Sequence, residues 1–156
     1  TVEDLRSRWF DDTLSFQPDW LSVKIGINDC HRWVAEKREL QSPAKFAEIY
    51  DEILSLTVKK LPGIKILLID PFYAGLDDGK EIPESYRGKV FKILSEYLKT
   101  VEAMTKKYKT LHVRTQSIFL EHFKYQSPMV FFPNEPVHPN SAGHTLIAEE
   151  VFKALS

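Results

Sequence analysis

The chain has 156 residues, of which 43% are apolar and 28% are charged. This length and apolar share suit one soluble domain over residues 1–156 with a core of its own. The 21 lysines and arginines nearly balance the 22 aspartates and glutamates, and like charges form no long run. Neither a nucleic acid nor a charged membrane surface is therefore expected as a partner.

The single cysteine, Cys30, excludes an internal disulfide and a cysteine-rich metal site. A reducing, cytoplasmic location fits this usage. No apolar stretch approaches the roughly 20 residues that cross a bilayer, so no membrane span is expected. Because the chain starts in the middle of a pattern, a signal peptide lost from its N-terminus is the alternative to a cytoplasmic location.

Apolar residues at helical spacing predict a helix over residues 2–16. Residues 20–25 have the length and residue types of a strand, which ends at Gly26. Trp9 in the helix and Trp20 at the start of the strand are expected in the core.

A polar loop around residues 38–43 precedes a helix that runs to about Lys60, where Pro62-Gly63 stops it. The apolar run 64–69 is typical of a strand that is covered on both faces. Residues 70–83 are predicted to form a long surface loop, and loops of this length often have a function.

Residues 84–108 are helical by pattern, and residues 110–113 predict a short strand. A last helix follows Pro139-Asn140, and its predicted buried stripe consists of Ile147, Val151, Phe152 and Leu155. The alternation of helix and strand predicts an α/β sandwich with a parallel sheet.

Ligands of parallel sheets bind beyond the carboxyl ends of the strands. The first strand delivers Gly26-Ile27-Asn28-Asp29 to that end. The side-chain amide of Asn28 can donate to an oxyanion, and Gly26 allows a tight turn before it. The alternative is an ordinary turn or helix cap built from an asparagine and an aspartate.

The second candidate set is Glu135-Pro136-Val137-His138-Pro139-Asn140, just before the last helix. A carboxylate three residues before a histidine can orient the imidazole, which then serves as general base to a serine. The alternative is a histidine that only caps the helix or packs against its neighbours.

Together these two sets resemble the SGNH (GDSL-type) esterases and lipases. Gly26-Ile27-Asn28-Asp29 is similar to the Gly-x-Asn-Asp block of that family, and Val137-His138-Pro139-Asn140 is similar to its C-terminal histidine block, in the same order and at matching separation. The resemblance covers essentially the whole chain. It implies a flavodoxin-like, three-layer α/β/α sandwich in which the N-terminal strand or strands are missing.

The resemblance also implies roles for single residues. Asn28 would donate to the oxyanion, while Gly26 and Asp29 would shape and brace its loop. His138 would take the proton from a serine and return it to the leaving alkoxide. Glu135 stands where the family has an aspartate; Asn134 is the neighbouring fallback for the orienting role.

The Gly-Asp-Ser block that supplies the family's nucleophile is missing, and no serine of the chain is assigned that role. Three explanations stay open: a cleaved or partly reported chain, a second chain that completes the sheet, or a degenerate remnant. The absent strand would leave one edge of strand 20–25 exposed.

Trp33, Phe72 and Tyr73 are candidate pocket residues, and loops 30–43 and 72–83 would set the specificity. Trp33 is placed in the loop above the sheet; surface packing is the alternative. Phe72 and Tyr73 follow a strand, and the alternative is that they only cover the sheet. The chemistry needs no cofactor, and no metal is expected because no ligand spacing is formed by the five histidines, His31, His112, His122, His138 and His144.

The sequence therefore predicts a hydrolase of small or carbohydrate-borne carboxylic esters, which acts through an acyl-enzyme on a serine outside the chain. The main alternative is a non-catalytic α/β module that keeps the pocket for binding or assembly. A flavodoxin-like nucleotide or regulator domain has less support, because no Gly-rich phosphate loop is present.

Overall fold

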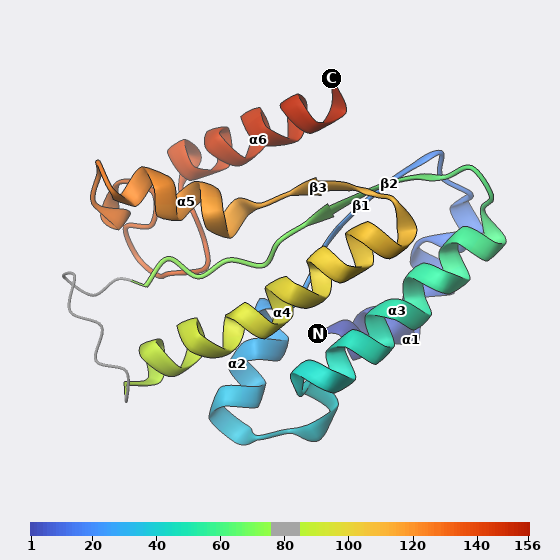
Figure 1. The fold of residues 1–156 in the computed structure, drawn as a ribbon, viewed down its shortest axis with the longest axis horizontal. Helices are drawn as coiled ribbons and strands as arrows, with labels where there is room; N and C mark the ends of the chain where they lie inside the picture. The colour runs from blue at the N-terminus through green and yellow to red at the C-terminus, as the bar shows by residue number, and fades with distance from the viewer. Residues whose placement is uncertain (76–84) are drawn as a thin grey trace.

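Figure 1 shows the computed structural model of the chain, which describes residues 1–75 and 85–156. The strands β1 (Trp20–Lys24), β2 (Lys65–Ile69) and β3 (Leu111–Val113) form one parallel sheet in the order β1-β2-β3. In its register, Val23 pairs with Leu68 and Leu68 with His112. The predicted α/β fold with a parallel sheet is confirmed.

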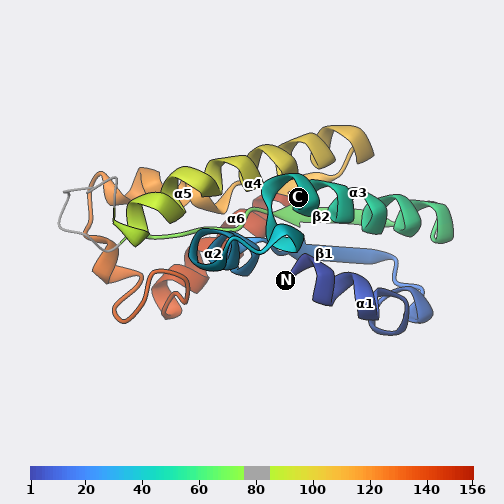
Figure 2. The same ribbon diagram turned by 90° about the horizontal axis from the view of Figure 1, so that it is seen from below.

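Helices lie on both faces of this sheet, as the two views in Figures 1 and 2 show. One face carries α1 to α4, and α6 packs against β3 on the other face. The bounds of the helices are α1 (Val2–Asp12), α2 (Ile27–Glu36), α3 (Pro43–Lys60), α4 (Tyr86–Tyr108), α5 (Thr115–Phe123) and α6 (Ser141–Leu155). Short 3₁₀ helices span Leu14–Phe16, Glu39–Gln41 and Pro128–Val130.

The main core lies between the sheet and helices α1 to α4. Trp9 is buried there as predicted, and its indole Nε1–H donates to Thr57 Oγ1 at 2.9 Å, so its polar atom is satisfied. A second, smaller apolar cluster is centred on Phe72, Phe119 and Phe132, with Leu146 of α6. The two clusters lie over opposite faces of the sheet.

Two predictions for the N-terminal third are wrong. The predicted helix 2–16 is divided, because α1 ends at Asp12, where the acidic residues of the last turn oppose the helix dipole although Arg8 pairs with Asp12 at 2.8 Å. Trp20 is exposed because β1 alternates and turns it to the face away from the main core. There the Lys65 ammonium lies 4.7 Å from the centroid of its ring.

The predicted stripe of α6 is also wrong in part. Gly143 and Leu146 are its buried residues, whereas Phe152 is 71% exposed and Leu155 is exposed as well. Burial is thus confined to the N-terminal half of α6, where the helix meets the second cluster. The apolar residues of its last two turns have no layer over them among the described residues.

The segment after β2 differs from the predicted surface loop over 70–83. Residues 70–74 are buried, because Tyr73 packs into the main core while Phe72 and Ala74 pack into the second apolar cluster. Residues 76–84 lie outside the described part of the chain. Helix α5, which follows β3 directly, was not predicted from the sequence.

Gly26 and Gly63 allow the cost of backbone strain and the cost of packing to be separated. Both have positive φ, +122° and +92°. A Cβ on Gly26 would lie 3.1 Å from the Phe46 ring, whereas nothing lies within 4 Å of one on Gly63. Gly63→Ala should lower the free energy of unfolding by about 1–3 kcal/mol through strain alone. Gly26→Ala should lower it by about 1–3 kcal/mol more through crowding. Equal losses in urea titrations would contradict the packing argument.

Candidate active site

The three parallel strands point to the left in Figure 1, so their carboxyl ends face the same side of the molecule. The segments that leave them begin at Ile25, Asp70 and Arg114. The chain between α5 and α6, which carries Glu135 and His138, lies at the same end. The two predicted site segments therefore occupy the edge where parallel sheets bind ligands.

Asn28 lies in the first turn of α2 and not in a loop, because the helix begins at Ile27. Gly26 reverses the chain with its positive φ and serves as N-cap. Asn28 is exposed. A helix start also presents free backbone N–H groups and the positive end of the helix dipole, which favour a developing negative charge beside the amide.

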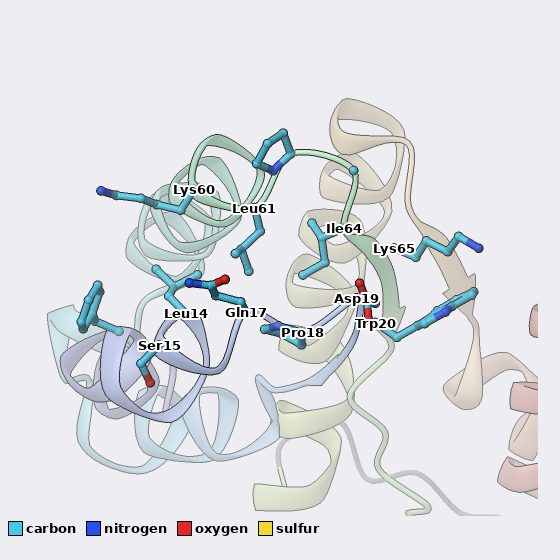
Figure 3. A pocket seen from close by; sticks show the side chains of 13 residues that line it. Leu14, Ser15, Gln17, Pro18, Asp19, Trp20, Lys60, Leu61, Ile64 and Lys65 are labelled. Carbon is cyan, nitrogen blue, oxygen red and sulfur yellow. The ribbon is translucent and has the colours of Figure 1, made fainter.

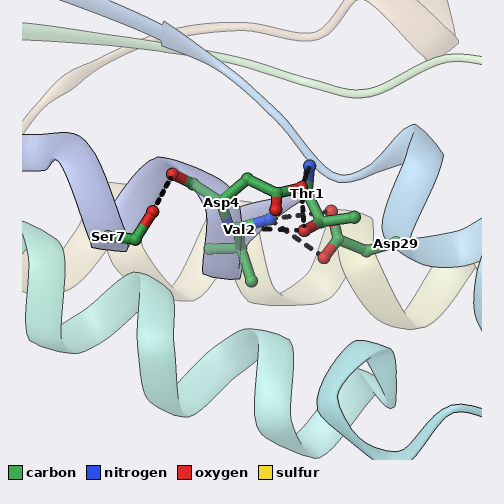
Figure 4. Close-up of polar contacts among 5 residues, drawn as sticks. All are labelled: Thr1, Val2, Asp4, Ser7 and Asp29. Atoms are coloured by element: carbon green, nitrogen blue, oxygen red, sulfur yellow. Dashed lines mark hydrogen bonds and ion pairs between the residues drawn. The ribbon is translucent and has the colours of Figure 1, made fainter.

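Asp29 braces this turn from inside the protein. Its carboxylate is fully buried and accepts the Val2 backbone N–H through both oxygens, at 3.0 and 3.2 Å. Figure 4 shows the carboxylate facing the first residues of α1. Burial raises the pKa of Asp29. The contact joins the start of α2 to the start of α1 across 27 positions of sequence.

His138 and Glu135 form an imidazole–carboxylate pair. His138 Nδ1 lies 2.7 Å from Glu135 Oε1, and the side chains are 74% and 55% exposed. Asn134, the fallback for the orienting role, makes no hydrogen bond to His138 in the described part of the chain. An ion pair this exposed contributes little to stability. The contact instead fixes the ring through Nδ1 and leaves Nε2 turned to other partners.

Hydrogen bonds on both sides hold the histidine segment. The backbone N–H of Ala74 donates to the Pro136 carbonyl at 2.8 Å, which ties the segment to the chain leaving β2. Asn140 caps α6 by accepting the Gly143 N–H at 3.1 Å and donates its side-chain amide to Val130 O at 2.9 Å. His138 thus stands between two anchored points.

The segment after β2 is pinned by Gln116. The Tyr73 backbone N–H donates to Gln116 Oε1 at 2.7 Å, and Gln116 Nε2 donates back to Tyr73 O at 3.3 Å. Both residues are buried, so this amide pair satisfies the backbone where it leaves the sheet. From the sequence, Gln116 was noted only for its position just after a strand, and its hydrogen bonds to Tyr73 were not predicted.

The three candidate pocket residues differ in their surroundings. Trp33 lies on α2 and not in a loop, because α2 continues to Glu36; its ring is partly buried, 5.0 Å from the Lys37 ammonium. Phe72 is buried in the second cluster, and the Lys24 ammonium lies 3.9 Å from its ring centroid. Tyr73 is buried in the main core. The packing of Phe72 and Tyr73 agrees with the alternative that they cover the sheet.

A second carboxylate–imidazole pair lies inside the protein. His112 Nε2 is 2.6 Å from Asp70 Oδ1, and the side chains are only 9% and 6% exposed. Thr115 Oγ1 donates to the Asp70 carbonyl at 2.7 Å, which further fixes the end of β2. Because neither side chain reaches the surface, this pair supports the segment and does not contact a substrate.

A pocket also lies at the other end of the sheet. Figure 3 shows this pocket, of about 930 Å³, at the amino ends of β1 and β2, where Trp20 and Lys65 line it. It does not include Asn28 or His138. No group of three metal-ligating side chains and no helix long and apolar enough to span a membrane occur among residues 1–75 and 85–156.

The buried Asp29 carboxylate should make stability depend on pH. Its pKa is raised in the folded state, so the unfolded chain loses the proton first and stability falls as the pH rises above about 4. Asp29→Asn should remove this fall and keep an oxygen that accepts the Val2 N–H. Asp51→Asn is a control with the opposite pH dependence, because hydrogen bonds from Lys107 and Tyr108 lower the pKa of Asp51. The contribution of Asp51 to the free energy of unfolding is lost as the pH falls below about 4. Parallel pH profiles of unfolding for Asp29→Asn and the unchanged chain would contradict the argument.

Comparison with known proteins places this geometry in a family. An acetylxylan esterase from Geobacillus stearothermophilus is 30% identical, in an alignment that covers 99% of this chain and 67% of the relative. A crystal structure of that esterase has a TM-score of 0.81 at 28% identity, with 100% of this chain and 68% of the other covered.

A crystal structure of a GDSL-like lipase from Parabacteroides merdae ATCC 43184 has a TM-score of 0.81 at 30% identity. The match covers 99% of this chain and 67% of the other chain. The model of the GDSL-like lipase/acylhydrolase family matches residues 1–146. These matches favour an ester hydrolase over the binding module and the nucleotide domain. The chain belongs to the GDSL-like lipase/acylhydrolase family of carboxylic ester hydrolases.

Proposed function

We propose that this chain supplies the base and an oxyanion donor of a serine esterase whose nucleophile lies outside residues 1–156. The observation that carries the proposal is the 2.7 Å contact between His138 Nδ1 and Glu135 Oε1, at the edge of the sheet that also holds Asn28. A carboxylate on Nδ1 fixes the tautomer in which Nε2 accepts a proton. His138 is thereby prepared to act as a general base.

In the proposed reaction, the serine oxygen attacks the ester carbonyl carbon while His138 Nε2 takes the hydroxyl proton. The Asn28 amide donates to the carbonyl oxygen, which becomes negative in the tetrahedral intermediate. When the intermediate collapses, the C–O bond to the alcohol breaks and Nε2 returns the proton to the leaving alkoxide. Water then hydrolyses the acyl-enzyme with His138 again as base.

The acetylxylan esterase supports these roles. Its solved catalytic mutants replace a serine, an aspartate and a histidine by alanine, and the aspartate lies three positions before the histidine. Glu135 and His138 have the same spacing. The glutamate is one methylene longer, and its contact with Nδ1 shows that the longer side chain reaches the imidazole.

Gly26 and Asp29 are proposed to shape the oxyanion site. The positive φ of Gly26 starts α2 directly after the strand, and the buried Asp29 holds its first turn. Trp33 is the proposed pocket residue of α2, one and a half turns beyond Asn28. Phe72 and Tyr73 are proposed to support the pocket from within the protein, where both are buried in the two apolar clusters.

The sheet offers a place for the serine-bearing strand. Within the described residues β1 pairs only with β2, so its other edge is open. We infer that a preceding segment, or a second chain, pairs there and brings the serine to the same carboxyl end. Residues 1–156 would then be part of a single domain, since both apolar clusters lie on this one sheet.

The substrate class is proposed from the relatives. The family name covers acyl ester hydrolysis in general, and the curated relative acts on acetylxylan. We therefore propose a small acyl group, such as acetyl, on a carbohydrate hydroxyl. The reaction is hydrolytic acyl transfer, in which His138 would serve as acid and base and Asn28 as oxyanion donor.

Labelling with a fluorophosphonate tests where the nucleophile lies. In the protein that carries this chain, the reagent should modify one serine on a peptide outside residues 1–156, as read by peptide mass spectrometry. His138→Ala should abolish the modification because the serine then lacks its base. His144→Ala changes an exposed histidine six positions later and should leave labelling intact. A modified serine within residues 1–156 would refute the proposed location.

Alanine variants test the roles in turnover of p-nitrophenyl acetate. Asn28→Ala should lower kcat by about 10² to 10³, as for loss of an oxyanion donor. His138→Ala should lower it by about 10⁴ or more. Glu135→Gln should also lower kcat, and Glu135→Asp should retain more activity than Glu135→Gln because it keeps the charge. Unchanged rates in both Asn28→Ala and His138→Ala would sink the assignment.

A further inference from the structure

His31 joins three elements beside the proposed oxyanion donor. It follows Asn28 by three positions on α2, so the two side chains share one face of the helix. Its ring stacks on Tyr86, the first residue of α4, with centroids 5.7 Å apart and an interplanar angle of 26°. Its ring also meets Tyr73 edge-on, with centroids 5.4 Å apart.

The contacts of His31 fix its hydrogen-bonding pattern. His31 Nδ1 lies 2.7 Å from Tyr86 Oη. Burial lowers the pKa of His31 and raises the pKa of Tyr86, so the imidazole is neutral and the phenol keeps its proton at pH 7. With the phenol donating to Nδ1, the imidazole proton is on Nε2. Nε2 has no hydrogen-bond partner in the part of the chain that the structure describes.

Tyr86 combines a fixed hydroxyl with an open ring. The residue is 46% exposed although its hydroxyl is engaged. A tyrosine held in this way presents a flat apolar surface at little further cost in entropy. The neighbouring Nε2–H adds a donor of fixed direction. A ring surface next to a single polar donor is the combination that a sugar ring, with its apolar C–H face and its hydroxyl rim, can use.

The pair of His31 and Tyr86 is also connected to the segment that carries His138. Tyr73 contacts His31, and the next residue, Ala74, donates its N–H to the Pro136 carbonyl at 2.8 Å. Pro136 lies two positions before His138. One continuous series of contacts therefore runs from the His31 ring, beside Asn28, to the segment that carries the base.

We propose that His31 and Tyr86 form the subsite for the alcohol part of the substrate, in which the Tyr86 ring stacks on the sugar that bears the ester and His31 Nε2–H donates to one of its hydroxyls. This subsite rests on the proposed esterase function and adds to it a group that distinguishes carbohydrate esters from simple ones. A purely structural role, packing α2 against α4, would affect every substrate alike.

Two substrates separate these roles. The protein that carries this chain is assayed with an acetylated xylo-oligosaccharide and with p-nitrophenyl acetate, which lacks the sugar. Tyr86→Ala should raise KM for the oligosaccharide by about tenfold and change kcat/KM for p-nitrophenyl acetate by less than about twofold. His31→Gln should act in the same direction. Tyr86→Phe keeps the ring and removes the hydroxyl, so its effect should be intermediate.

Tyr108→Phe is the matched control, because it removes another hydrogen-bonded hydroxyl from the far end of the same helix. It should leave the ratio of the two kcat/KM values unchanged. Parallel losses on both substrates in Tyr86→Ala, or no change on either, would overturn the subsite while leaving the esterase proposal intact. Absence of hydrolysis and of fluorophosphonate labelling in the unmodified protein would instead refute the esterase proposal and the subsite with it.

Discussion

Parallel pairing of three strands is the constraint on which the arrangement of this site depends. Because β1, β2 and β3 run in the same direction, the segments that leave them reach one edge of the sheet although they are far apart in sequence. No strand delivers His138, however. Its segment is held to that edge by the Ala74 N–H, which donates to the Pro136 carbonyl. The chain leaving β2 therefore connects the two halves of the site.

That connection explains why polar residues lie buried near β2. Gln116 satisfies the backbone N–H and the backbone carbonyl of Tyr73. The Asp70 carboxylate pairs with His112, and the Asp70 backbone carbonyl accepts from Thr115. Buried polar groups are costly unless they are paired, and here each pair fixes the position of the segment as it leaves the sheet. The Ala74 N–H that donates to Pro136 therefore belongs to a segment with fixed neighbours, and Asn140 anchors the histidine segment on its other side.

The sequence predicts the parts of this structure that depend on local pattern. The strands, the long helices and the spacing of Glu135 and His138 could all be read from neighbouring residues. The placement of Trp33 could not, because the Asn-Asp pair after Gly26 is compatible with a turn or with the first turn of a helix. Burial of Phe72 depends on Phe119 and Phe132, which come from segments without a strong pattern of their own. The exposure of Phe152 could not be predicted either, because it depends on how much of α6 the second apolar cluster covers.

The two carboxylate–imidazole pairs illustrate how environment separates the catalytic role proposed for Glu135 and His138 from a structural one. Both have contacts of similar length, 2.7 Å for Glu135 with His138 and 2.6 Å for Asp70 with His112. The inner pair uses Nε2 for its carboxylate, and its side chains are only 9% and 6% exposed, so it is shielded from solvent. The outer pair uses Nδ1 and is exposed, which leaves Nε2 accessible.

Because the contact between Glu135 and His138 is exposed to water, it restrains the two side chains only weakly. The backbone compensates for this at His138. Pro136 and Pro139 flank the histidine, and each proline fixes its own φ and restricts the residue before it. A Cβ on Gly143 would lie 2.5 Å from Pro139 Cβ, so α6 also holds that proline from behind. The glutamate then needs only to select the tautomer, and a side chain one methylene longer than aspartate can do so.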